Sequence, residues 1–430
     1  LAELLGLYVG ASAFPWFSES AGWRAAGARG LEAEAARQVF PDGLSREQAS
    51  EYHGFVLEIL LVAAVEGLVT GRPLSADFHA VLVRMADAWA ALLDRKLRPP
   101  RQGDTDEGRV LVLDATGPDR RPGALLAAAG ALVGAAPWWP AVVPDVRSRL
   151  FAALASGSAP DRAARRLLPR PARRPQLFAD AGLALLRDLE PREDELWCRC
   201  DHGPHGYLSI AAHAHADALS IELRHGGVDI LADPGTYCYL TERPFRRYFR
   251  STVGHNTLEI GGRDQARFGG PFLWLDAPRS HLLATKGLDA GPAAEWSARH
   301  EGYRRLPGRP VHERSVRLDR QARSVRIADS ILASRPCPVR LAFHLGPAVE
   351  ARLDGCAASL AWFSGSRRWH GRLLLPDRLA WRAVRGSLDP IGGWYSPAFG
   401  ERVPSTTFIG EGTLSPGVRV ETILDIGPSA

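Results

Sequence analysis

Lysine is nearly absent from this sequence of 430 residues, because Lys96 and Lys286 are the only lysines among 53 basic residues. The guanidinium group of arginine presents paired N–H donors that fit carboxylate, sulfate and phosphate groups. The formal net charge of +5 is compatible with ordinary solubility and also with a polyanionic substrate. No basic run is interleaved with aromatic residues, so nucleic acid is not the expected partner.

Cysteines and long apolar runs are scarce as well. Five cysteines at irregular spacing argue against a disulfide framework. The longest apolar runs, such as residues 59–65, are far shorter than the ~20 residues of a membrane span. No signal peptide opens the chain, but Leu1 falls in the middle of an apolar helical pattern. We therefore expect an N-terminally truncated chain, for which a missing signal peptide excludes nothing.

The first third of the chain has helical periodicity. Ser75 is a plausible N-cap, and apolar residues then recur at steps of three or four up to Leu92. Residues 52–69, 124–133 and 142–155 are apolar almost all round, as in helices buried between neighbours. Successive helical hairpins with short connections predict an incomplete α/α toroid over residues 1–160.

The remaining chain has the alternation of strands. Residues 161–175 contain six arginines and three prolines and are expected to form a linker. Beyond it, residues 219–223 and 228–230 flank the turn His225-Gly226-Gly227 and predict a hairpin. Similar short strands are expected at residues 257–260, 315–318, 324–327, 339–344, 372–375 and 418–423. The fold class is therefore α+β and multidomain, with a large antiparallel β-sandwich over residues 176–430.

Candidate chemistry concentrates between residues 202 and 265. His213 and His215 would share one face of an extended segment, Asp233 follows the next strand, and His255 opens a further one. Two imidazoles and a carboxylate are a normal zinc set. Because H-x-H and Asp-Pro-Gly also occur by chance, the spacing leaves a zinc site and a hydrogen-bonded structural cluster both open.

The motifs of this region carry a resemblance to a known family. The runs HAHADALSIELRHGGVDILADPGTYCY, FRSTVGHNTLEI and DQARFGGPFLW resemble the signature of heparinase II/III-like polysaccharide lyases. In the helical half, FPDGLSREQASEYHGFVLEIL and GDTDEG resemble two further motifs of that family. Members pair an N-terminal α/α toroid with a C-terminal antiparallel β-sandwich, which is the architecture predicted above.

The resemblance implies roles for individual residues. Zinc would be held by His215, Asp233 and His255. His213 would face the substrate as a catalytic residue, with Tyr52 of the helical part as its partner. Glu3 matches an acidic position that follows an Asn-His pair in relatives, and that pair would fall before Leu1.

The implied reaction is β-elimination on a uronic-acid-containing polysaccharide, a glycosaminoglycan or exopolysaccharide, by a periplasmic or secreted lyase. Tyr239, Arg250 and Trp274 are the expected substrate contacts around the site. We interpret Asp104 only as a residue for helix capping and loop order. The arginines of residues 243–250 fit either a solvated face or a grip on a polyanion.

Two other functions fit the same residues. A zinc-containing glycan-binding or accessory protein of this fold, without activity, is the main alternative, since truncation could remove the carboxylate-neutralising group. A metallohydrolase with zinc-activated water is the second.

Overall fold

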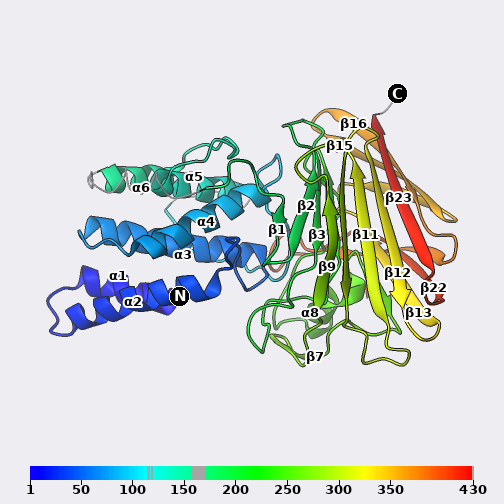
Figure 1. The fold of residues 1–430 in the computed structure, drawn as a ribbon, viewed down its shortest axis with the longest axis horizontal. Helices are drawn as coiled ribbons and strands as arrows, with labels where there is room; N and C mark the ends of the chain where they lie inside the picture. The colour runs from blue at the N-terminus through cyan, green and yellow to red at the C-terminus, as the bar shows by residue number, and fades with distance from the viewer. Residues whose placement is uncertain (114–116, 118–119, 157–169, 429–430) are drawn as a thin grey trace. The chain divides into compact units, whose positions relative to one another are not determined.

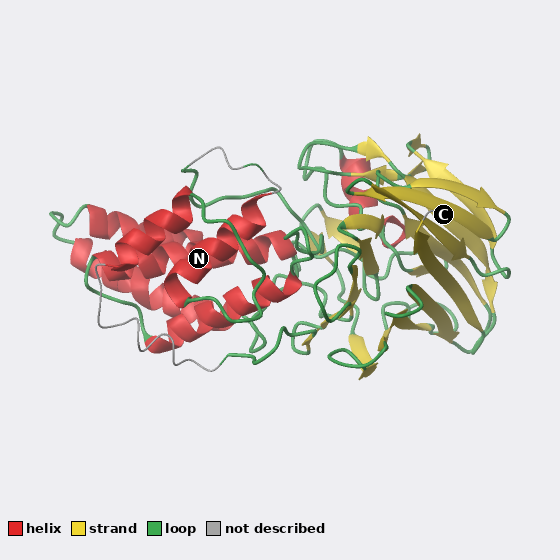
Figure 2. Cartoon of the chain, turned by 90° about the horizontal axis from the view of Figure 1, so that it is seen from above, coloured by secondary structure: helices red, strands yellow, loops and turns green. Residues whose placement is uncertain are grey.

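The computed structural model describes residues 1–113, 117, 120–156 and 170–428. The chain divides into two compact units: Leu1–Pro99 with Glu107–Pro175, and Pro100–Asp106 with Gln176–Ala430. Helices gather in the first unit and strands in the second (Figure 2). Within the expected linker, residues 161–169 lie outside the described part of the chain.

Consecutive helices of the first unit pack as hairpins, α1 on α2, α3 on α4 and α5 on α6 (Figure 1). The expected cap of α4 is confirmed, because the Phe78 N–H donates to Ser75 Oγ at 3.3 Å. The described helices of this unit are α1 (Ala2–Ala13), α2 (Ser20–Gln38), α3 (Ser50–Val69), α4 (Ala76–Leu92), α5 (Arg121–Val133) and α6 (Val146–Ser156).

Helix α3 is the centre of the helical unit. It alone among the described helices is long and apolar enough to cross a membrane, but 72% of its apolar window is buried inside the structure. Leu57, Leu60 and Leu61 are fully buried and belong to one hydrophobic core with Met85 of α4 and Leu126 of α5. This burial is that of a core helix in a globular unit.

The second unit is built from antiparallel sheets. A five-stranded sheet has the order β1-β2-β3-β4-β5, an eight-stranded sheet β14-β15-β16-β23-β12-β11-β10-β9, and a four-stranded sheet β17-β22-β13-β6. The strands of the five-stranded sheet are β1 (Leu177–Phe178), β2 (Leu183–Arg187), β3 (Leu196–Asp201), β4 (Ile221–His225) and β5 (Val228–Leu231).

The larger sheets use most of the chain beyond residue 257. The eight-stranded sheet contains β9 (Ser280–Lys286), β10 (Ala293–His300), β11 (Val311–Asp319), β12 (Ser324–Leu332), β14 (Glu350–Asp354), β15 (Ala357–Ser364), β16 (Arg367–Leu374) and β23 (Arg419–Pro428). The four-stranded sheet contains β6 (Leu258–Ile260), β13 (Cys337–His344), β17 (Ala380–Arg385) and β22 (Thr406–Leu414). Short pairs are β7 (Phe268–Gly270) with β8 (Leu273–Trp274), β18 (Ser387–Leu388) with β19 (Ile391–Gly392), and β20 (Trp394–Tyr395) with β21 (Val403–Pro404).

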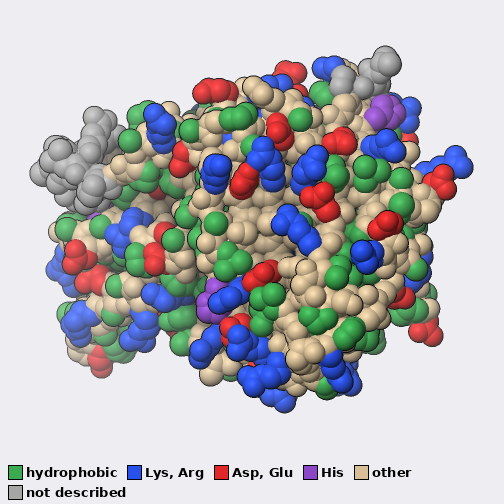
Figure 3. Space-filling view, turned by 45° about the vertical axis from the view of Figure 1, so that its right-hand side comes forward, with side chains coloured by type: hydrophobic (Ala, Val, Ile, Leu, Met, Phe, Trp, Pro, Cys, Tyr) green, Lys and Arg blue, Asp and Glu red, His purple; other side chains and the backbone are tan. Residues whose placement is uncertain are grey.

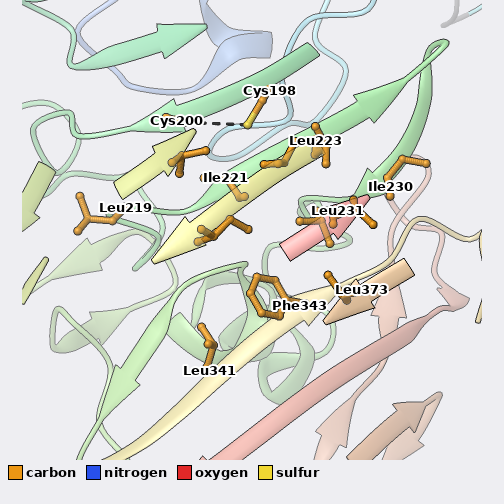
Figure 4. Packing of buried hydrophobic residues seen from close by; sticks show 14 of the residues in the cluster. Cys198, Cys200, Leu219, Ile221, Leu223, Ile230, Leu231, Leu341, Phe343 and Leu373 are labelled. Carbon is orange, nitrogen blue, oxygen red and sulfur yellow. Dashed lines mark hydrogen bonds between the residues drawn. The ribbon is translucent and has the colours of Figure 1, made fainter. Parts of the chain in front are cut away.

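All three large sheets contribute to one hydrophobic core. In Figure 4, Cys198 and Cys200 of β3 lie on the same side of the core as Leu223, opposite Phe343 of β13 and Leu373 of β16. The two sulfur atoms are 4.0 Å apart and form no disulfide, so these cysteines serve packing. The predicted combination of helices with large antiparallel sheets is thus confirmed.

The predicted hairpin is β4 and β5, joined at Gly226 and Gly227. Their φ angles of 55° and 71° lie in the left-handed region, where glycine carries no steric penalty. Both faces of β4 are buried, so its polar residues do not face water. Glu222 and Arg224, each 1% exposed, must therefore find partners inside the unit.

Candidate functional site

His213 and His215 lie in the loop between β3 and β4, and not in extended backbone as expected. Side chains from outside the loop hold it in place. The Ala214 carbonyl accepts hydrogen bonds from Trp274 Nε1 at 2.9 Å and from the Arg250 guanidinium at 3.2 and 3.3 Å. The orientation of both imidazoles therefore depends on tertiary contacts.

Both histidines approach the carboxylate of Asp104, which is fully buried. His215 Nε2 lies 3.0 Å from Asp104 Oδ1, and His213 Nδ1 lies 3.5 Å from Oδ2. Arg246 of α8 (Arg243–Arg250) donates to both oxygens, with 2.6 Å from Nη2 to Oδ2. Burial alone would raise the pKa of Asp104, but hydrogen bonds from Arg246, His213 and His215 hold it well below its ordinary value.

Hydrogen bonds also fix the tautomers of two imidazoles. A carboxylate only accepts hydrogen bonds, so His215 Nε2 is the donor to Asp104. Burial lowers the pKa of His215 to about 4, so the ring is neutral and its Nδ1 atom carries a lone pair. His255 follows the short 3-10 helix η2 (Thr252–Gly254) and donates from Nδ1 to the Ser251 carbonyl at 2.7 Å. His255 Nε2 faces His215 Nδ1 at 3.2 Å. Only a proton or a cation between these nitrogen atoms makes that approach favourable.

Two carboxylates complete the cluster. Asp233 Oδ1 accepts the Gly235 N–H at 3.0 Å in the predicted Asp-Pro-Gly turn, whereas Oδ2 is buried and accepts no hydrogen bond from any described residue. Asp233 Oδ2 lies 3.6 Å from His255 Nε2. Asp217 Oδ2 is likewise buried without a hydrogen bond, and burial raises the pKa of Asp217 to about 7. One ligand atom each of Asp217, Asp233 and His255 lies within 4.8 Å of the others.

The residues of this cluster fit a zinc ion. In a tetrahedral site with ligand bonds of about 2.05 Å, neighbouring ligand atoms are about 3.3 Å apart. The separations of 3.2 Å and 3.6 Å around His255 Nε2 match that geometry. The chemistry of the donors matches as well, because two imidazole nitrogens and a carboxylate oxygen are normal zinc ligands. The structure thus places His255 next to both His215 and Asp233, whereas the described group whose ligand atoms all lie within 4.8 Å of one another is Asp217, Asp233 and His255, without His215.

A buried ion network lies directly behind Asp233. Arg199 of β3 pairs with Glu222 of β4 at 2.9 Å and lies 3.8 Å from Asp233 Oδ2. Glu222 also accepts the backbone N–H of Arg101 at 3.0 Å and a bond from Arg224 at 3.2 Å. These contacts orient the carboxylate side of the cluster.

Asn256 holds the imidazole side of the cluster. Its Nδ2 donates to the carbonyls of Ile221 and Ala232, both at 2.9 Å, and its Oδ1 accepts the His344 N–H at 2.7 Å. The Asn256 side chain therefore connects the segment after His255 to the backbone of Ile221, Ala232 and His344. The His-Asn-Thr motif carries a structural residue next to the candidate ligand.

Two family models match the chain: "Heparinase II/III N-terminus" over residues 1–108 and "Heparinase II/III-like, C-terminal" over residues 170–422. The chain belongs to the heparinase II/III-like family. No curated protein sequence matches it.

Solved structures show where else this fold occurs. A heparinase III gene product has a TM-score of 0.72 at 17% sequence identity, with 99% of this chain and 59% of that chain covered. The heparan sulfate lyase of Pedobacter heparinus has a TM-score of 0.70 at 17% identity, with 100% and 60% covered. This heparinase II/III-like chain therefore spans about three fifths of the length of those proteins.

The predicted substrate contacts of this heparinase II/III-like chain fall into two groups. Arg250 is fully buried and donates to the carbonyls of Ala214, Gly270 and Pro271, while Trp274 is 2% exposed and packs under Arg250. Both contacts are structural. Tyr239 is only half-buried, with its ring against Phe272, Phe399 and Arg246.

The helical unit holds the remaining predicted residues. Tyr52 is half-buried in the first turn of α3, edge-on to Phe55 at 6.5 Å. Glu3 is exposed in the first turn of α1. His53 accepts the Ser45 N–H at 3.2 Å and contacts the Met85 carbonyl at 3.2 Å, so its role is structural.

Sequence reasoning missed the charged half of this heparinase II/III-like site. Asp104 is more than the capping or loop residue we expected, because it is the shared partner of two histidines and an arginine. Arg246 is 2% exposed and does not belong to a solvated face. The available signal was the GDTDEG motif, whose first aspartate is Asp104.

Proposed function

We propose that this chain is part of a polysaccharide lyase that cleaves a uronate-containing acidic glycan by β-elimination. Tyr52 and His213 would act as acid and base, and a structural zinc would be held by His215, Asp233 and His255. The observation that carries the proposal is the different environment of the two neighbouring histidines. The His215 side chain is fully buried, whereas that of His213 is 20% exposed.

This difference supports separate roles. A buried imidazole with a fixed tautomer suits a metal, and a partly exposed imidazole can meet a substrate. Asp104 accepts from His215 and lies 3.5 Å from His213 Nδ1, so one carboxylate contacts both rings. The neighbours in structure are themselves a heparinase III and a heparan sulfate lyase, which favours the same reaction class.

In β-elimination, a base removes the C5 proton of the uronate while the bond from C4 to the glycosidic oxygen breaks. The electron pair of the C–H bond becomes the C4–C5 double bond, and the leaving oxygen takes a proton from an acid. Tyr52 would take or return a proton at these atoms, and His213 would be the second proton-transfer group. Zinc, when bound, would supply no step and would fix the segments that carry His213 and His255.

Several finer features belong to the same proposal. The helices would form part of an α/α toroid over residues 1–160, joined by the linker 161–175 to a β-sandwich over residues 176–430. Tyr239 and Glu3 would contact or orient the substrate, while Arg250 and Trp274 would shape the loop beneath it. An enzyme for an extracellular glycosaminoglycan or exopolysaccharide would be periplasmic or secreted.

The burial of the metal cluster argues against a metallohydrolase. A catalytic zinc needs a coordination position that water and substrate can reach. His215, Asp233 and His255 are at most 2% exposed. An inactive glycan-binding protein of the same fold is the alternative that activity measurements must address.

The test is an elimination assay on a panel of uronic-acid polymers, in which the reaction is monitored through the ultraviolet absorbance of the unsaturated product. We expect Tyr52→Phe to lower the rate by roughly 100-fold or more while glycan binding and folding persist. Tyr8→Phe is the matched control, because Tyr8 lies in the same unit but is 1% exposed. Full activity of Tyr52→Phe would place the base elsewhere, with Tyr239 the next candidate, and binding without elimination by the wild type would favour the inactive protein.

A further inference from the structure

A pocket lies in the sheet unit, outside the histidine and aspartate cluster. Its volume is about 640 Å³, which is within the range of small-molecule sites. The walls come from α8, the η2 turn, strands β13 and β17, and the β18–β19 hairpin. We call it the arginine pocket, after the four arginines that line it: Arg247, Arg340, Arg382 and Arg385.

The charges of the arginine pocket do not cancel. Glu259 and Asp264 are the acidic residues of its lining, and burial raises the pKa of both carboxyl groups. Arg340 uses its Nε and Nη2 atoms on Glu259, both at 2.7 Å, and its Nη1 atom makes no hydrogen bond to a described residue. Arg382 pairs with Glu411 at 3.3 Å, but both side chains are 47% exposed, so that pair is weak.

Two of the arginines form no ion pair within 4.0 Å in the part of the chain that the structure describes, although the charge of Arg247 acts on Asp264 of the same lining. Arg385 ends β17, and Arg247 stands on the exposed side of α8 with its guanidinium over the Phe268 ring at 5.4 Å. On the same helix, Arg246 and Arg250 point to Asp104 and to backbone carbonyls. Helix α8 therefore presents arginine both to the candidate catalytic site and to the arginine pocket.

The pocket also has an apolar wall. Pro390, Ile391 and Ile409 line it beside the arginines. A sugar unit that carries sulfate or carboxylate offers the matching surfaces, since its C–H face suits apolar side chains and its anions suit guanidinium forks. On the face in Figure 3, acidic side chains lie beside many of the basic ones.

We propose that the arginine pocket is a second binding site for an acidic glycan, occupied by a sulfated or carboxylated sugar unit. The choice of a glycan over another anion rests on the proposed function. The site is separate from the elimination chemistry, because its lining contains none of the proposed catalytic or metal-binding residues. It would hold the polymer or its product while the reaction takes place elsewhere on the chain.

The test measures binding of a size-defined heparin tetrasaccharide by calorimetry at low salt, in the Tyr52→Phe background to prevent turnover. We expect two tetrasaccharides per chain. Arg247→Ala/Arg385→Ala should lose one of them, or bind it at least about tenfold more weakly, because two charge-assisted contacts to the sugar anions are removed. The matched control is Arg352→Ala/Arg372→Ala, which removes two exposed arginines from β14 and β16 and should change nothing.

Unchanged stoichiometry and affinity in the Arg247→Ala/Arg385→Ala variant, or no tetrasaccharide binding at all, would overturn the proposal. Inorganic sulfate is titrated in parallel, and an equal affinity for sulfate would show a site for a free anion, which also overturns it. When Tyr52 is restored in the double variant, the rate of elimination should stay within about twofold of the wild-type rate. A change of that size is well below the tenfold change that corresponds to 1.4 kcal/mol. If no polymer is cleaved but the double variant still loses a tetrasaccharide, the pocket stands and the proposed function fails.

Discussion

At the scale of single residues, the division of labour between His213 and His215 is the sharpest feature of the site. Both rings meet the same carboxylate, yet only the ring of His215 turns its second nitrogen to His255, at 3.2 Å. His215, a candidate zinc ligand, and His213, a candidate catalytic residue, are therefore only two positions apart in the sequence.

This division predicts opposite outcomes for two substitutions. His215→Ala should remove bound zinc and lower thermal stability, because the ligands connect separate segments of the chain. His213→Ala should keep a full complement of zinc and lose elimination. Metal analysis of the purified variants decides, and equal loss of zinc from both would make His213 a ligand.

Asp104 supports a second prediction. Asp104→Asn keeps the shape of the side chain but leaves the buried Arg246 without a counter-charge, so we expect a loss of about 3–5 kcal/mol in the free energy of unfolding. Zinc affinity should fall about 10–100-fold, since the charged acceptor that orients His215 is replaced by a weaker, neutral amide oxygen. Urea unfolding and zinc titration measure the two effects.

Asp106→Asn is the control for this charge change, because Asp106 is exposed two residues away. Its stability and zinc affinity should match those of the wild type. A stable Asp104→Asn protein with normal zinc affinity would contradict the role given to Asp104.

At the scale of elements, α8 shows where sequence reasoning reaches its limit. The RPFRRYFR segment has the composition of a solvated surface, but Arg246 and Arg250 are buried. Their acceptors, Asp104 and the carbonyls of Ala214 and Pro271, come from distant parts of the sequence. No local pattern encodes such partners, so the burial could not be predicted.

Other elements follow directly from local pattern. The cap of α4 at Ser75 and the burial of α3 were predicted from periodicity, as was the β4–β5 hairpin from its two glycines. The site is intermediate in this respect. Motifs indicated His215, Asp233 and His255 as site residues. No motif marked Asp217, Arg199 or Glu222, because only the folded structure shows that these polar residues are buried.

Helix α8 carries a third prediction. Arg250→Met removes the hydrogen bonds from the guanidinium to the carbonyls of Ala214, Gly270 and Pro271, and a hydrogen bond from a charged donor contributes about 1.5–3 kcal/mol. We expect unfolding at distinctly lower urea concentration and weaker zinc binding, because the loop with His213 and His215 loses its clamp. Arg243→Met, on the exposed side of the same helix, should behave like the wild type. Equal stability of the two variants would mean that the clamp is unimportant.

At the scale of the whole molecule, buried neutral histidines predict a loss of stability in acid. Burial lowers the pKa of His53, His202 and His225 to about 4 and that of His344 to about 3. The unfolded chain, with an ordinary histidine pKa of about 6.5, binds protons first as the pH falls. Stability is therefore complete above about pH 6.5 and is lost progressively toward pH 4, by up to about 1.4 kcal/mol per pH unit for each histidine. Burial raises the pKa of Asp201 and of Asp217 to about 7, which acts in the opposite direction and offsets part of this loss.

Urea midpoints at several pH values between 7.5 and 5 test this expectation. His53→Gln should flatten the dependence, because it removes one of the titrating groups. His281→Gln should leave it unchanged, since His281 is 45% exposed. Midpoints that do not vary with pH would contradict the assignment of these histidines as neutral.

The second unit is discontinuous in sequence, because it includes residues 100–106 as well as the chain from Gln176 onward. The short insert is joined to the sheets by bonds from Gln102 to Asp201, from Thr105 to Thr236 and between the backbones of Asp104 and His213. Division of the chain between residues 106 and 176 would thus yield a C-terminal piece without Asp104, in which Arg246 and His215 have lost their shared carboxylate. A sheet unit made without the helical unit must therefore carry residues 100–106 together with residues 176–430.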